Sequence, residues 1–501
     1  MRGERIRRIV IVGGGTAGWM TAAALSRVND PKLFEISLVE SDDIGIVGVG
    51  EATIPTIHWF NQLAGLDDRD LLRETHTTYK LGIEFVGWNG DGSNYLHPFG
   101  RYGGPADGSM FYHRWLRARA DGDTTPYDAY SLTTQIARAG RFGMPASDPR
   151  TLGSTLGYAF HFDAAAYARM LRARCEQQGV VRHEGLITDV AQDGESGFVT
   201  AVTTNRGVTI EGDLFIDCSG FRGLLIEQTL KTGYEDWTHW LPCDRALAVP
   251  CDRAEKLTPY TRATARAAGW QWRIPLQHRT GNGYVYSSQY IDDDAAAETL
   301  LANLDGKPLA DPRPLRFTTG RRRKSWNKNV IAIGLSSGFL EPLESTSIHL
   351  IQSAIAKLLS LFPAKDCDPL VAEQYNRVYG RDVEAVRDFL ILHYHRTQGR
   401  EEPLWRACQA MSLPDNLVYK EEQFVRTGRI VLDSDELFRE ASWFAVMMGQ
   451  GLDPVDYNPL ADAFSTEANA AHLLRLRTEI AAVAASAPTH EAAIEQRLAG
   501  G

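Results

Sequence analysis

A glycine-rich turn near the start of the chain constrains its fold more than any other feature. Gly13, Gly15 and Gly18 follow the β-branched run Arg8–Val12 and precede a segment with helical spacing of apolar residues. Glycines at this spacing permit a tight turn and let a pyrophosphate approach the backbone, where the first N–H groups of the helix bind it. Glu40 ends the next expected strand, where a carboxylate accepts hydrogen bonds from ribose hydroxyls. The sequence therefore predicts a dinucleotide site formed by Gly13, Gly15, Thr16, Ala17, Gly18 and Glu40.

Two later segments favour FAD over NAD as the dinucleotide. Asp213–Gly220 and Asn329–Gly334 are each a short apolar strand that runs into a turn of small residues. Both resemble the second and third flavin-contact segments of flavoproteins with the two-dinucleotide-binding fold. We therefore expect Gly334 and Leu335 to contribute to the cofactor site.

The rest of the chain is predicted to interleave strands and helices. A glycine-rich turn at Gly281–Gly283 predicts a hairpin whose second strand covers residues 284–290. Apolar residues at helical spacing predict a helix from about residue 346 that Pro363 ends, with mostly helices beyond it. Short apolar or β-branched runs between turn residues predict further strands at 34–39, 199–204, 207–210, 214–216 and 330–333.

These elements predict an α/β fold with three parts. They are a Rossmann-like FAD-binding module of the two-dinucleotide-binding type, an interleaved β-rich substrate region and a helical C-terminal part. We expect the FAD-binding module to span residues 1–365, with inserted substrate-region segments at about 85–150 and 231–315. Residues 366–501 are expected to be mainly helical and to complete the substrate pocket.

Composition narrows the range of partners. The formal net charge of -10 repels phosphate backbones, so nucleic acid is not an expected partner. We interpret the basic run Arg321–Lys324 as a solvated loop. Six scattered cysteines without a CxxC pair predict neither a metal site nor disulfides, as is typical of the cytoplasm. The longest apolar runs are too short for a membrane span, so we expect no membrane association.

Four ordered motifs resemble those of the flavin-dependent halogenases, and in particular the tryptophan halogenases. Trp270–Pro275 matches the WxWxIP motif of that family, and Gly48–Pro55 is similar to its GxGEATIP segment. Lys80 follows at the place of the family's catalytic lysine, and Glu341–Thr346 matches its PLEST segment. The resemblance extends from the N-terminus to about residue 360 and continues more weakly to Leu452.

The resemblance implies an oxidative halogenation. FAD, used as FADH2, reacts with oxygen, and chloride or bromide is converted to hypohalous acid, which reaches the substrate through a tunnel. The substrate is then an electron-rich aromatic ring, that of indole or a tryptophan-like compound. A separate flavin reductase is expected because the chain has one dinucleotide fingerprint and no second for NADH. We expect the protein to be a monomer or a homodimer.

The resemblance also implies roles for individual residues around the flavin. Lys80 would hydrogen-bond the hypohalous acid or form a haloamine; without the resemblance, a lysine here would be interpreted as a surface residue. Glu344 would stabilise the cationic ring and accept its proton, and it can also cap the helix that follows. Thr346 and Ser347 would bind the halide at a helix start, although many family members have glycine after the threonine. The flavin ring would lie beside Gly50, Glu51 and Ala52.

A further set of residues is implied on the substrate side. Trp270 and Trp272 would keep substrate away from the flavin, or would only pack the core of a strand. His97 and Phe99 resemble the element that stacks on indole, but such a loop can also be structural. Tryptophan-specific members hold the amino-acid group with a tyrosine pair, which Ser442–Ala445 lacks. The implied substrate and tunnel residues are His97, Phe99, Trp270, Trp272, Ile274, Pro275, Ser345 and Trp443.

Other activities fit parts of the sequence. Gly334–Gly338 matches the GxSxG pattern of a serine hydrolase, but Pro342 follows too soon for the helix that a nucleophile elbow requires. An FAD-dependent aromatic monooxygenase shares the glycine motifs, yet hydroxylation needs neither Lys80 nor Glu344. A flavin-binding protein without catalysis would also have no use for Lys80.

Overall fold

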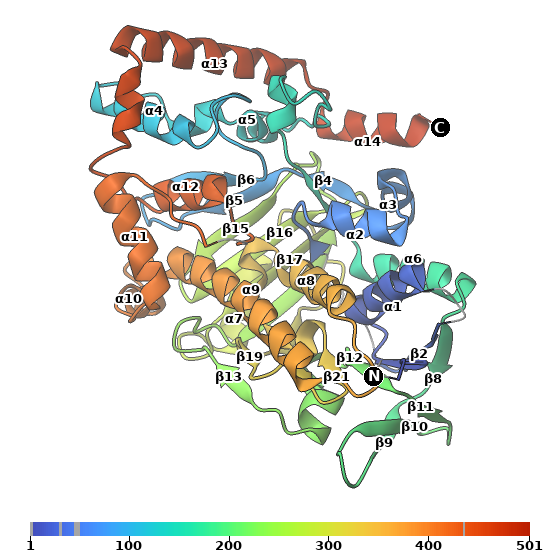
Figure 1. Cartoon of the computed structure of the whole chain (residues 1–501). Coiled ribbons are helices and arrows are strands. Elements are labelled where there is room, and N and C mark those ends of the chain that lie inside the picture. Colours follow the sequence, from blue (N-terminus) through green and yellow to red (C-terminus); the bar gives the residue numbers. More distant parts are fainter. Residues whose placement is uncertain (1–3, 30–32, 45–50, 434–435, 501) are drawn as a thin grey trace. The chain divides into compact units, whose positions relative to one another are not determined.

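The computed structural model describes residues 4–29, 33–44, 51–433 and 436–500 (Figure 1). Contacts divide the chain into two compact units, and each unit is assembled from three separate stretches of sequence. The first unit comprises Met1–His76, Phe162–Thr238 and Phe317–Glu384. The second unit comprises Thr77–His161, His239–Arg316 and Ala385–Gly501.

The first unit is built on a six-stranded sheet. Its strand order is β20-β21-β12-β1-β2-β8, in which all neighbours are parallel except β20 and β21. Parallel strands buried on both faces are apolar throughout, as β1 illustrates: Ile9 to Val12 are at most 3% exposed. The strands are β1 (Arg8–Val12), β2 (Glu35–Glu40), β8 (Val181–Glu184), β12 (Leu214–Asp217), β20 (Trp326–Asn327) and β21 (Val330–Ala332).

Helices cover one face of this sheet and a small antiparallel sheet covers the other. Helix α1 (Thr16–Val28) packs against α2 (Ile57–Ala64), α6 (Ala164–Gln177) and α8 (Ser347–Ser360). On the opposite face, Val199 and Val202 form a core with Val10, Val39 and Phe215. Val199 and Val202 belong to β10 (Val199–Thr204), which forms a three-stranded sheet with β9 (Ile187–Gln192) and β11 (Thr209–Glu211). The unit also contains α3 (Asp68–Glu74), β3 (Glu51–Ala52), β13 (Tyr234–Asp236), β19 (Gly320–Arg322), β22 (Gly338–Phe339) and the start of α9 (Pro369–His395).

The basic run at Arg321–Lys324 is only partly the solvated loop that the sequence suggested: Arg323 and Lys324 are exposed and follow strand β19, but the first two arginines are part of it. Arg321 and Arg322 lie in β19, and Arg322 is only 8% exposed. Arg321 pairs with Glu235 and Glu384, and Arg322 pairs with Glu227 at 2.8 Å. The interpretation was wrong for Arg321 and Arg322 because the compensating carboxylates are distant in sequence.

The second unit is built on a seven-stranded sheet of order β18-β14-β17-β16-β15-β5-β6. Only the β15–β5 pair is parallel. A further short strand, β4 (Thr78–Lys80), pairs antiparallel with β7 (Ala159–Phe162). The strands of the large sheet are β5 (Gly82–Val86), β6 (Asn94–Pro98), β14 (Arg245–Asp252), β15 (Thr261–Arg266), β16 (Gly269–Pro275), β17 (Arg279–Tyr286) and β18 (Arg313–Arg316).

The hairpin expected around Gly281–Gly283 is displaced. These residues lie inside β17 and pair with β16, so the turn between the two strands falls before Arg279. A Cβ on Gly283 would lie 2.0 Å from Cζ2 of Trp272 on the neighbouring strand. Glycine at this position therefore leaves space for the indole ring of Trp272. Besides forming turns, glycine is common in strands where another group approaches the backbone closely.

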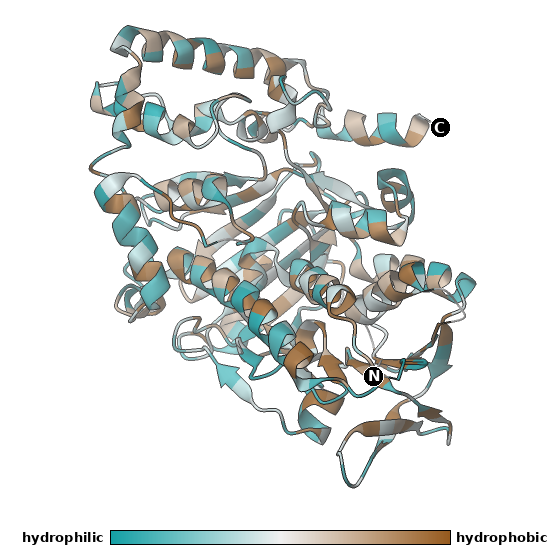
Figure 2. Ribbon diagram, in the orientation of Figure 1, coloured by the Kyte–Doolittle hydropathy of each residue, from teal (hydrophilic) through white to brown (hydrophobic). Residues whose placement is uncertain are grey.

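Helices complete the second unit. Helix α13 (Thr466–Ser486) packs against α4 (Met110–Ala120) and α5 (Leu132–Arg138). Hydrophobic and hydrophilic residues alternate along α13 in Figure 2 because only one face of the helix is buried. Helix α12 (Glu440–Gly449) packs on β6. The remaining helices are the end of α9, α7 (Asp293–Ala302), α10 (Pro403–Gln409), α11 (Asp415–Thr427) and α14 (His490–Ala499).

The mixed α/β class, with a parallel sheet and a helical C-terminal part, is confirmed. The segments expected as insertions at about 85–150 and 231–315 fall in the second unit, apart from 231–238. Residues 366–384 group with the first unit, and the helical remainder groups with the second.

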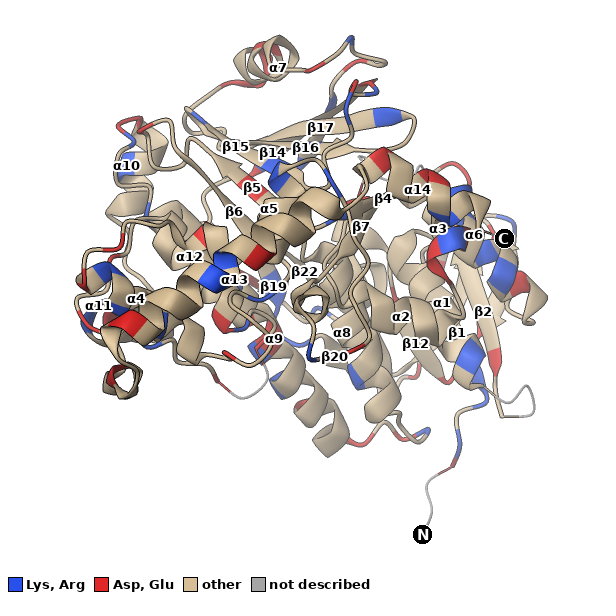
Figure 3. Ribbon diagram, turned by 90° about the horizontal axis from the view of Figure 1, so that it is seen from above, with Lys and Arg blue, Asp and Glu red and all other residues tan. Residues whose placement is uncertain are grey.

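Charged residues, cysteines and metal-ligating residues in the part of the chain that the structure describes bear on the expectations from composition. Acidic and basic residues are interspersed along α11 and α13 in Figure 3, so these two helices present no field of a single sign. All six cysteines are buried, and none of them forms a disulfide. Within the described ranges, no three His, Cys, Asp or Glu side chains group as metal ligands do, and no helix has the length and hydropathy of a membrane span.

Candidate functional site

The glycine turn after β1 has the geometry of a phosphate site. Gly13 has a φ of +108°, which L side chains rarely adopt, and a Cβ on Gly18 would lie 1.9 Å from the Gly13 carbonyl oxygen. By contrast, no described atom lies within 4 Å of the point where a Cβ on Gly15 would be. Helix α1 begins directly after Gly15, so its first N–H groups border this open space. The residues present therefore fit the pyrophosphate of a dinucleotide.

Glu40 lies at the end of β2 beside this turn. Its Oε1 accepts a hydrogen bond from Arg182 at 2.5 Å and lies 3.5 Å from Arg172. Its Oε2 lies only 1.5 Å from the point where a Cβ on Gly14 would be. The two arginines therefore hold the carboxylate against the turn, with its second oxygen directed at Gly14.

The two later turns also lie close to α1. A Cβ on Gly334, where φ is +78°, would lie 2.8 Å from Cβ of Ala17. The Asp217 carboxylate is buried and accepts hydrogen bonds from the backbone N–H groups of Leu225 and Ile226, both at 2.8 Å. This structural carboxylate was missed by the sequence analysis, although its place at the end of a buried strand was visible.

The hydrolase alternative does not fit the GxSxG segment. Ser336 is fully buried and its hydroxyl donates to the backbone carbonyl oxygens of Ile333 and Asp217. Leu335 and Ser336 form a single 3₁₀ turn that leads into β22 instead of a helix. Ser336 therefore lacks the exposed hydroxyl of a nucleophile elbow.

The segment that resembles GxGEATIP is described from Glu51 onward, and Gly50 lies outside the described residues. Glu51 and Ala52 form β3, and burial raises the pKa of Glu51 to about 7. Shortly after them, the Thr56 hydroxyl is 3.1 Å from Oε1 of Gln352 and 3.0 Å from Nδ1 of His349. Hydrogen bonds therefore join this segment to α8, the helix that follows the PLEST segment.

The PLEST segment ends in a constrained turn. Glu344 is fully buried at the end of a 3₁₀ turn, and Ser345 has a left-handed φ of +57°. The Thr346 hydroxyl is buried and has no hydrogen-bond partner among the described residues. Helix α8 begins at Ser347. A buried hydroxyl without a partner next to the first N–H groups of a 14-residue helix is suited to an anion.

Lys80, in the second unit, is fully buried. Its Nζ lies 4.9 Å from the centre of the Phe99 ring. Burial and the charge of Lys80 together hold the pKa of His161 well below its usual range. Lys80 is therefore not a surface lysine with a solvated head.

The WxWxIP motif lies in β16. Trp270 and Trp272 are buried, with ring centroids 6.1 Å apart, and the Trp272 Nε1 has no acceptor among the described residues. The Pro275 carbonyl oxygen accepts a hydrogen bond of 2.7 Å from the hydroxyl of Thr78. The end of the motif therefore anchors the short strand that carries Lys80, and Ile274 is buried beside it.

His97 belongs to an aromatic cluster. Its ring centroid lies 5.7 Å from that of Phe389 and 6.0 Å from that of Phe438. Phe389 stacks on Phe438 at 3.8 Å and meets Trp443 edge-on at 4.9 Å. The structure thus brings together two predicted substrate residues, His97 and Trp443. Phe389 and Phe438 were missed because neither lies in a motif.

A buried ion pair supports one side of this cluster. Lys420 pairs with Glu436, and both side chains are less than 7% exposed. Glu436 also accepts from the Trp443 indole at 3.2 Å and from the Asp433 N–H at 2.9 Å. The Lys420 Nζ lies 5.0 Å from the centre of the Trp443 ring and donates to the Val431 carbonyl. This network fixes the residues that lead into α12. Phe438 is one of these residues.

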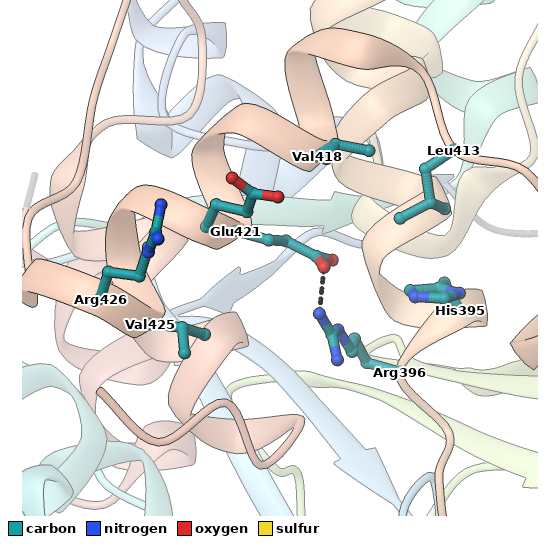
Figure 4. Close-up of a pocket in the computed structure, with 8 residues that line it drawn as sticks. His395, Arg396, Leu413, Val418, Glu421, Val425 and Arg426 are labelled. Carbon is teal, nitrogen blue, oxygen red and sulfur yellow. Dashed lines mark hydrogen bonds and ion pairs between the residues drawn. The ribbon is translucent and has the colours of Figure 1, made fainter. Parts of the chain in front are cut away.

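A separate cavity of about 560 Å³ lies between the end of α9 and α11. Figure 4 shows Arg396 and Glu421 facing each other as an ion pair on its wall. The lining residues are His395, Arg396, Leu413, Val418, Glu421, Glu422, Val425 and Arg426, none of which was predicted as a site residue.

Comparisons with known proteins show the family to which the chain is similar. The family model described as tryptophan halogenase matches residues 8–466. The tryptophan 6-halogenase SttH of Streptomyces toxytricini is 36% identical over 495 residues, which cover 92% of this chain and 93% of that protein. The solved structure of BrvH, a flavin-dependent halogenase from Brevundimonas sp. BAL3, superposes with a TM-score of 0.94 at 45% identity, covering 98% of this chain and 99% of that one. A flavin-dependent halogenase from Xanthomonas campestris has the same TM-score and identity, with 99% of each chain covered. The chain belongs to the tryptophan halogenase family of flavin-dependent halogenases.

Proposed function

We propose that this protein uses reduced FAD, oxygen and chloride or bromide to halogenate an electron-rich aromatic ring, that of indole or a tryptophan-like compound. Lys80 carries the proposal, because a fully buried lysine over an aromatic ring is unusual without a functional reason. A separate flavin reductase would supply the reduced flavin.

The first unit would hold the cofactor and the halide. Bound FAD, once reduced, supplies the electrons with which oxygen is activated toward the halide. The pyrophosphate would occupy the open space at Gly15 and the start of α1, and Glu40 would bind the ribose. Gly50, Glu51, Ala52, Gly334 and Leu335 are the further proposed contacts. Thr346 and Ser347 would bind the halide at the start of α8.

Lys80 would act on the oxidant. The negative face of the Phe99 ring stabilises a cation above it, which offsets part of the desolvation cost that burial imposes on the ammonium form of Lys80. An ammonium can donate a hydrogen bond to hypohalous acid and make its halogen more electrophilic, whereas a neutral amine would form a haloamine. We therefore favour the hydrogen-bonded form of the oxidant.

Glu344 would act on the ring intermediate. Attack by an electrophilic halogen gives a cationic ring that must lose a proton. A buried carboxylate stabilises that cation strongly, since the local dielectric is low, and it can accept the proton. This role requires the Glu344 carboxylate to border the bound substrate.

The aromatic cluster favours the ring over the amino-acid group as the recognised feature. His97, Phe389, Phe438 and Trp443 form a buried aromatic cluster that would present flat apolar surfaces to an indole. The nearby charges of Lys420 and Glu436 neutralise each other. Since Ser442–Ala445 also lacks the tyrosine pair of tryptophan-specific members, we propose indole, or an indole without a free amino-acid group, as the preferred substrate class.

The test is a reaction with bromide, oxygen, FAD and a flavin reductase, in which bromoindole is measured by mass spectrometry. A chemical trap measures hypobromous acid that escapes. The wild-type protein should produce bromoindole. Lys80→Ala should lose it while still releasing oxidant, and Glu344→Gln should slow its formation. Hydroxyindole as the main product would favour a monooxygenase, and unchanged bromoindole from Lys80→Ala would exclude the proposed role of that residue.

A further inference from the structure

The C-terminal segment of the second unit reaches the strand that carries Lys80. Residues between α13 and α14 run beside Gly140–Phe142: Arg141 forms an isolated bridge with Thr489, and the Phe142 N–H donates to the Pro488 carbonyl at 3.1 Å. The His490 N–H donates to the Gly140 carbonyl, also at 3.1 Å. This pairing fixes the start of α14 and directs the His490 side chain into the core, where it is 1% exposed.

His490 joins two backbone groups from distant parts of the chain. Its Nε2 accepts a hydrogen bond of 3.0 Å from the Tyr79 N–H, and its Nδ1 lies 3.2 Å from the Leu257 carbonyl oxygen. A carbonyl can only accept, so Nδ1 carries the proton and Nε2 carries the lone pair. Burial lowers the pKa of His490 to about 4, so the imidazole is neutral and keeps this arrangement at neutral pH.

The contacts around β4 restrict the position of Lys80. The Tyr79 ring stacks on Phe142 at 3.9 Å, and the Thr78 hydroxyl donates to the Pro275 carbonyl. The Leu81 N–H donates to the Pro259 carbonyl at 2.7 Å. Successive side chains of a strand point to opposite faces. Anchoring Tyr79 on one face of β4 therefore fixes the direction of the Lys80 side chain on the opposite face.

We propose that His490 is a positioning residue for halogenation, which holds the Tyr79 peptide so that the Lys80 ammonium stays over Phe99 and meets the oxidant. This role rests on the proposed function of Lys80. Without His490, the Tyr79 N–H loses its buried acceptor and β4 can shift. A displacement of about 1 Å in such a group lowers the rate of a positioned reaction by as much as about a hundredfold. The cofactor residues lie in the other unit, so oxidant production should continue.

The readout is the ratio of bromoindole formed to hypobromous acid trapped, measured for the full-length FAD-loaded protein with a flavin reductase. His490→Phe keeps an aromatic ring but cannot accept the hydrogen bond, and should lower the ratio about tenfold or more. His490→Gln can accept from Tyr79 and donate to Leu257, and should restore most of the ratio. If His490→Phe does not fold, His490→Asn serves instead, because its shorter amide cannot reach both groups.

Ile494→Ala is the matched control. It removes a buried side chain from the same helix, so it should lower the melting temperature as His490→Phe does but leave the ratio unchanged. The positioning role is excluded if His490→Phe or His490→Asn keeps the wild-type ratio, if His490→Gln fails to restore it, or if Ile494→Ala lowers it equally. A wild-type protein that makes no halogenated product would contradict the proposed function itself.

Discussion

The two units build their sites in different ways. In the first unit, the proposed phosphate site is a local structure: β1, the glycine turn, α1 and Glu40 follow one another in sequence. In the second unit, Lys80, His97, Phe389, Trp443 and His490 come from five separate elements or loops. Backbone geometry forms the first site, whereas side chains packed over long sequence distances form the second.

This difference predicts different responses to mutation. A backbone site is lost when a side chain enters space that the ligand needs, while the fold remains. A site made of packed side chains is lost when any one supporting contact is removed, and stability falls at the same time. Each of the following changes tests this comparison.

The largest effect on stability is expected from Lys420→Met in the second unit. The change leaves the Glu436 carboxylate buried without its cation, which costs about 3–5 kcal/mol of unfolding free energy. Denaturant unfolding measures the loss. The control is Arg119→Met, which breaks the exposed Arg119–Asp453 pair and should cost less than about 1 kcal/mol. Equal losses in the two variants would mean that the buried network does not support the aromatic cluster.

The second test applies to the first unit. In Gly15→Val, the new side chain enters the open space before α1, so FAD affinity should fall at least about a hundredfold, or about 2.7 kcal/mol. The backbone at Gly15 is extended, with φ of -72°, and accepts valine, so the melting temperature of the FAD-free protein should change little. Flavin fluorescence titration measures the affinity, and Lys80→Ala should bind FAD normally. FAD retained by Gly15→Val would place the dinucleotide elsewhere.

The same contrast explains what could be predicted from the sequence. Several elements of the first unit were predicted closely: β1 and β10 have the expected bounds, and α8 begins one residue after the expected start. Their signals are local, namely apolar periodicity, glycine spacing and the stop at Pro363. In the second unit, family motifs identified Lys80, His97 and the two tryptophans.

The errors and omissions all depend on long-range contacts. Gly283 was interpreted as part of a turn because its neighbour Trp272 is not evident from local sequence. Arg321 was assigned to a solvated loop because its carboxylate partners lie far along the chain. Phe389 and His490 have no motif, and a single sequence does not reveal which residues they contact. The roles of Lys80 and Glu344 remain predictions.

Gly283→Ala should destabilise the second unit by about 2 kcal/mol. The added Cβ would lie 2.0 Å from Trp272 and 2.5 Å from the Leu247 carbonyl oxygen, so the strand or the indole must shift. Combining it with Trp272→Phe should recover part of the loss by freeing space. Gly194→Ala in the first unit is the control, since no described atom lies within 4 Å of its Cβ position. A fully tolerated Gly283→Ala would mean that the indole can move, which would weaken the comparison.

The smallest expected effect is a pH dependence of stability in the first unit. Burial raises the pKa of Glu51 from 4.5 to about 7, so between these values the folded protein binds a proton that the unfolded chain has released. The contribution of Glu51 to stability is therefore complete below pH 4.5 and is lost as the pH rises through about 7. The full shift corresponds to at most about 3 kcal/mol, and partial exposure of the side chain reduces the expected loss to about 1–2 kcal/mol.

Glu51→Gln removes this titration, so its unfolding free energy should fall less between pH 5 and pH 8 than that of the wild-type protein. Glu35→Gln, at an exposed position on β2, should follow the wild-type curve. Parallel curves for the wild type and Glu51→Gln would show that Glu51 is solvated in the folded protein. In that case the burial of Glu51 would add nothing to the first unit. If the curves diverge as expected, Glu51 is a desolvated carboxyl of the first unit in addition to Asp217 and Glu344, and the contrast with Lys80 and Lys420 is one of degree.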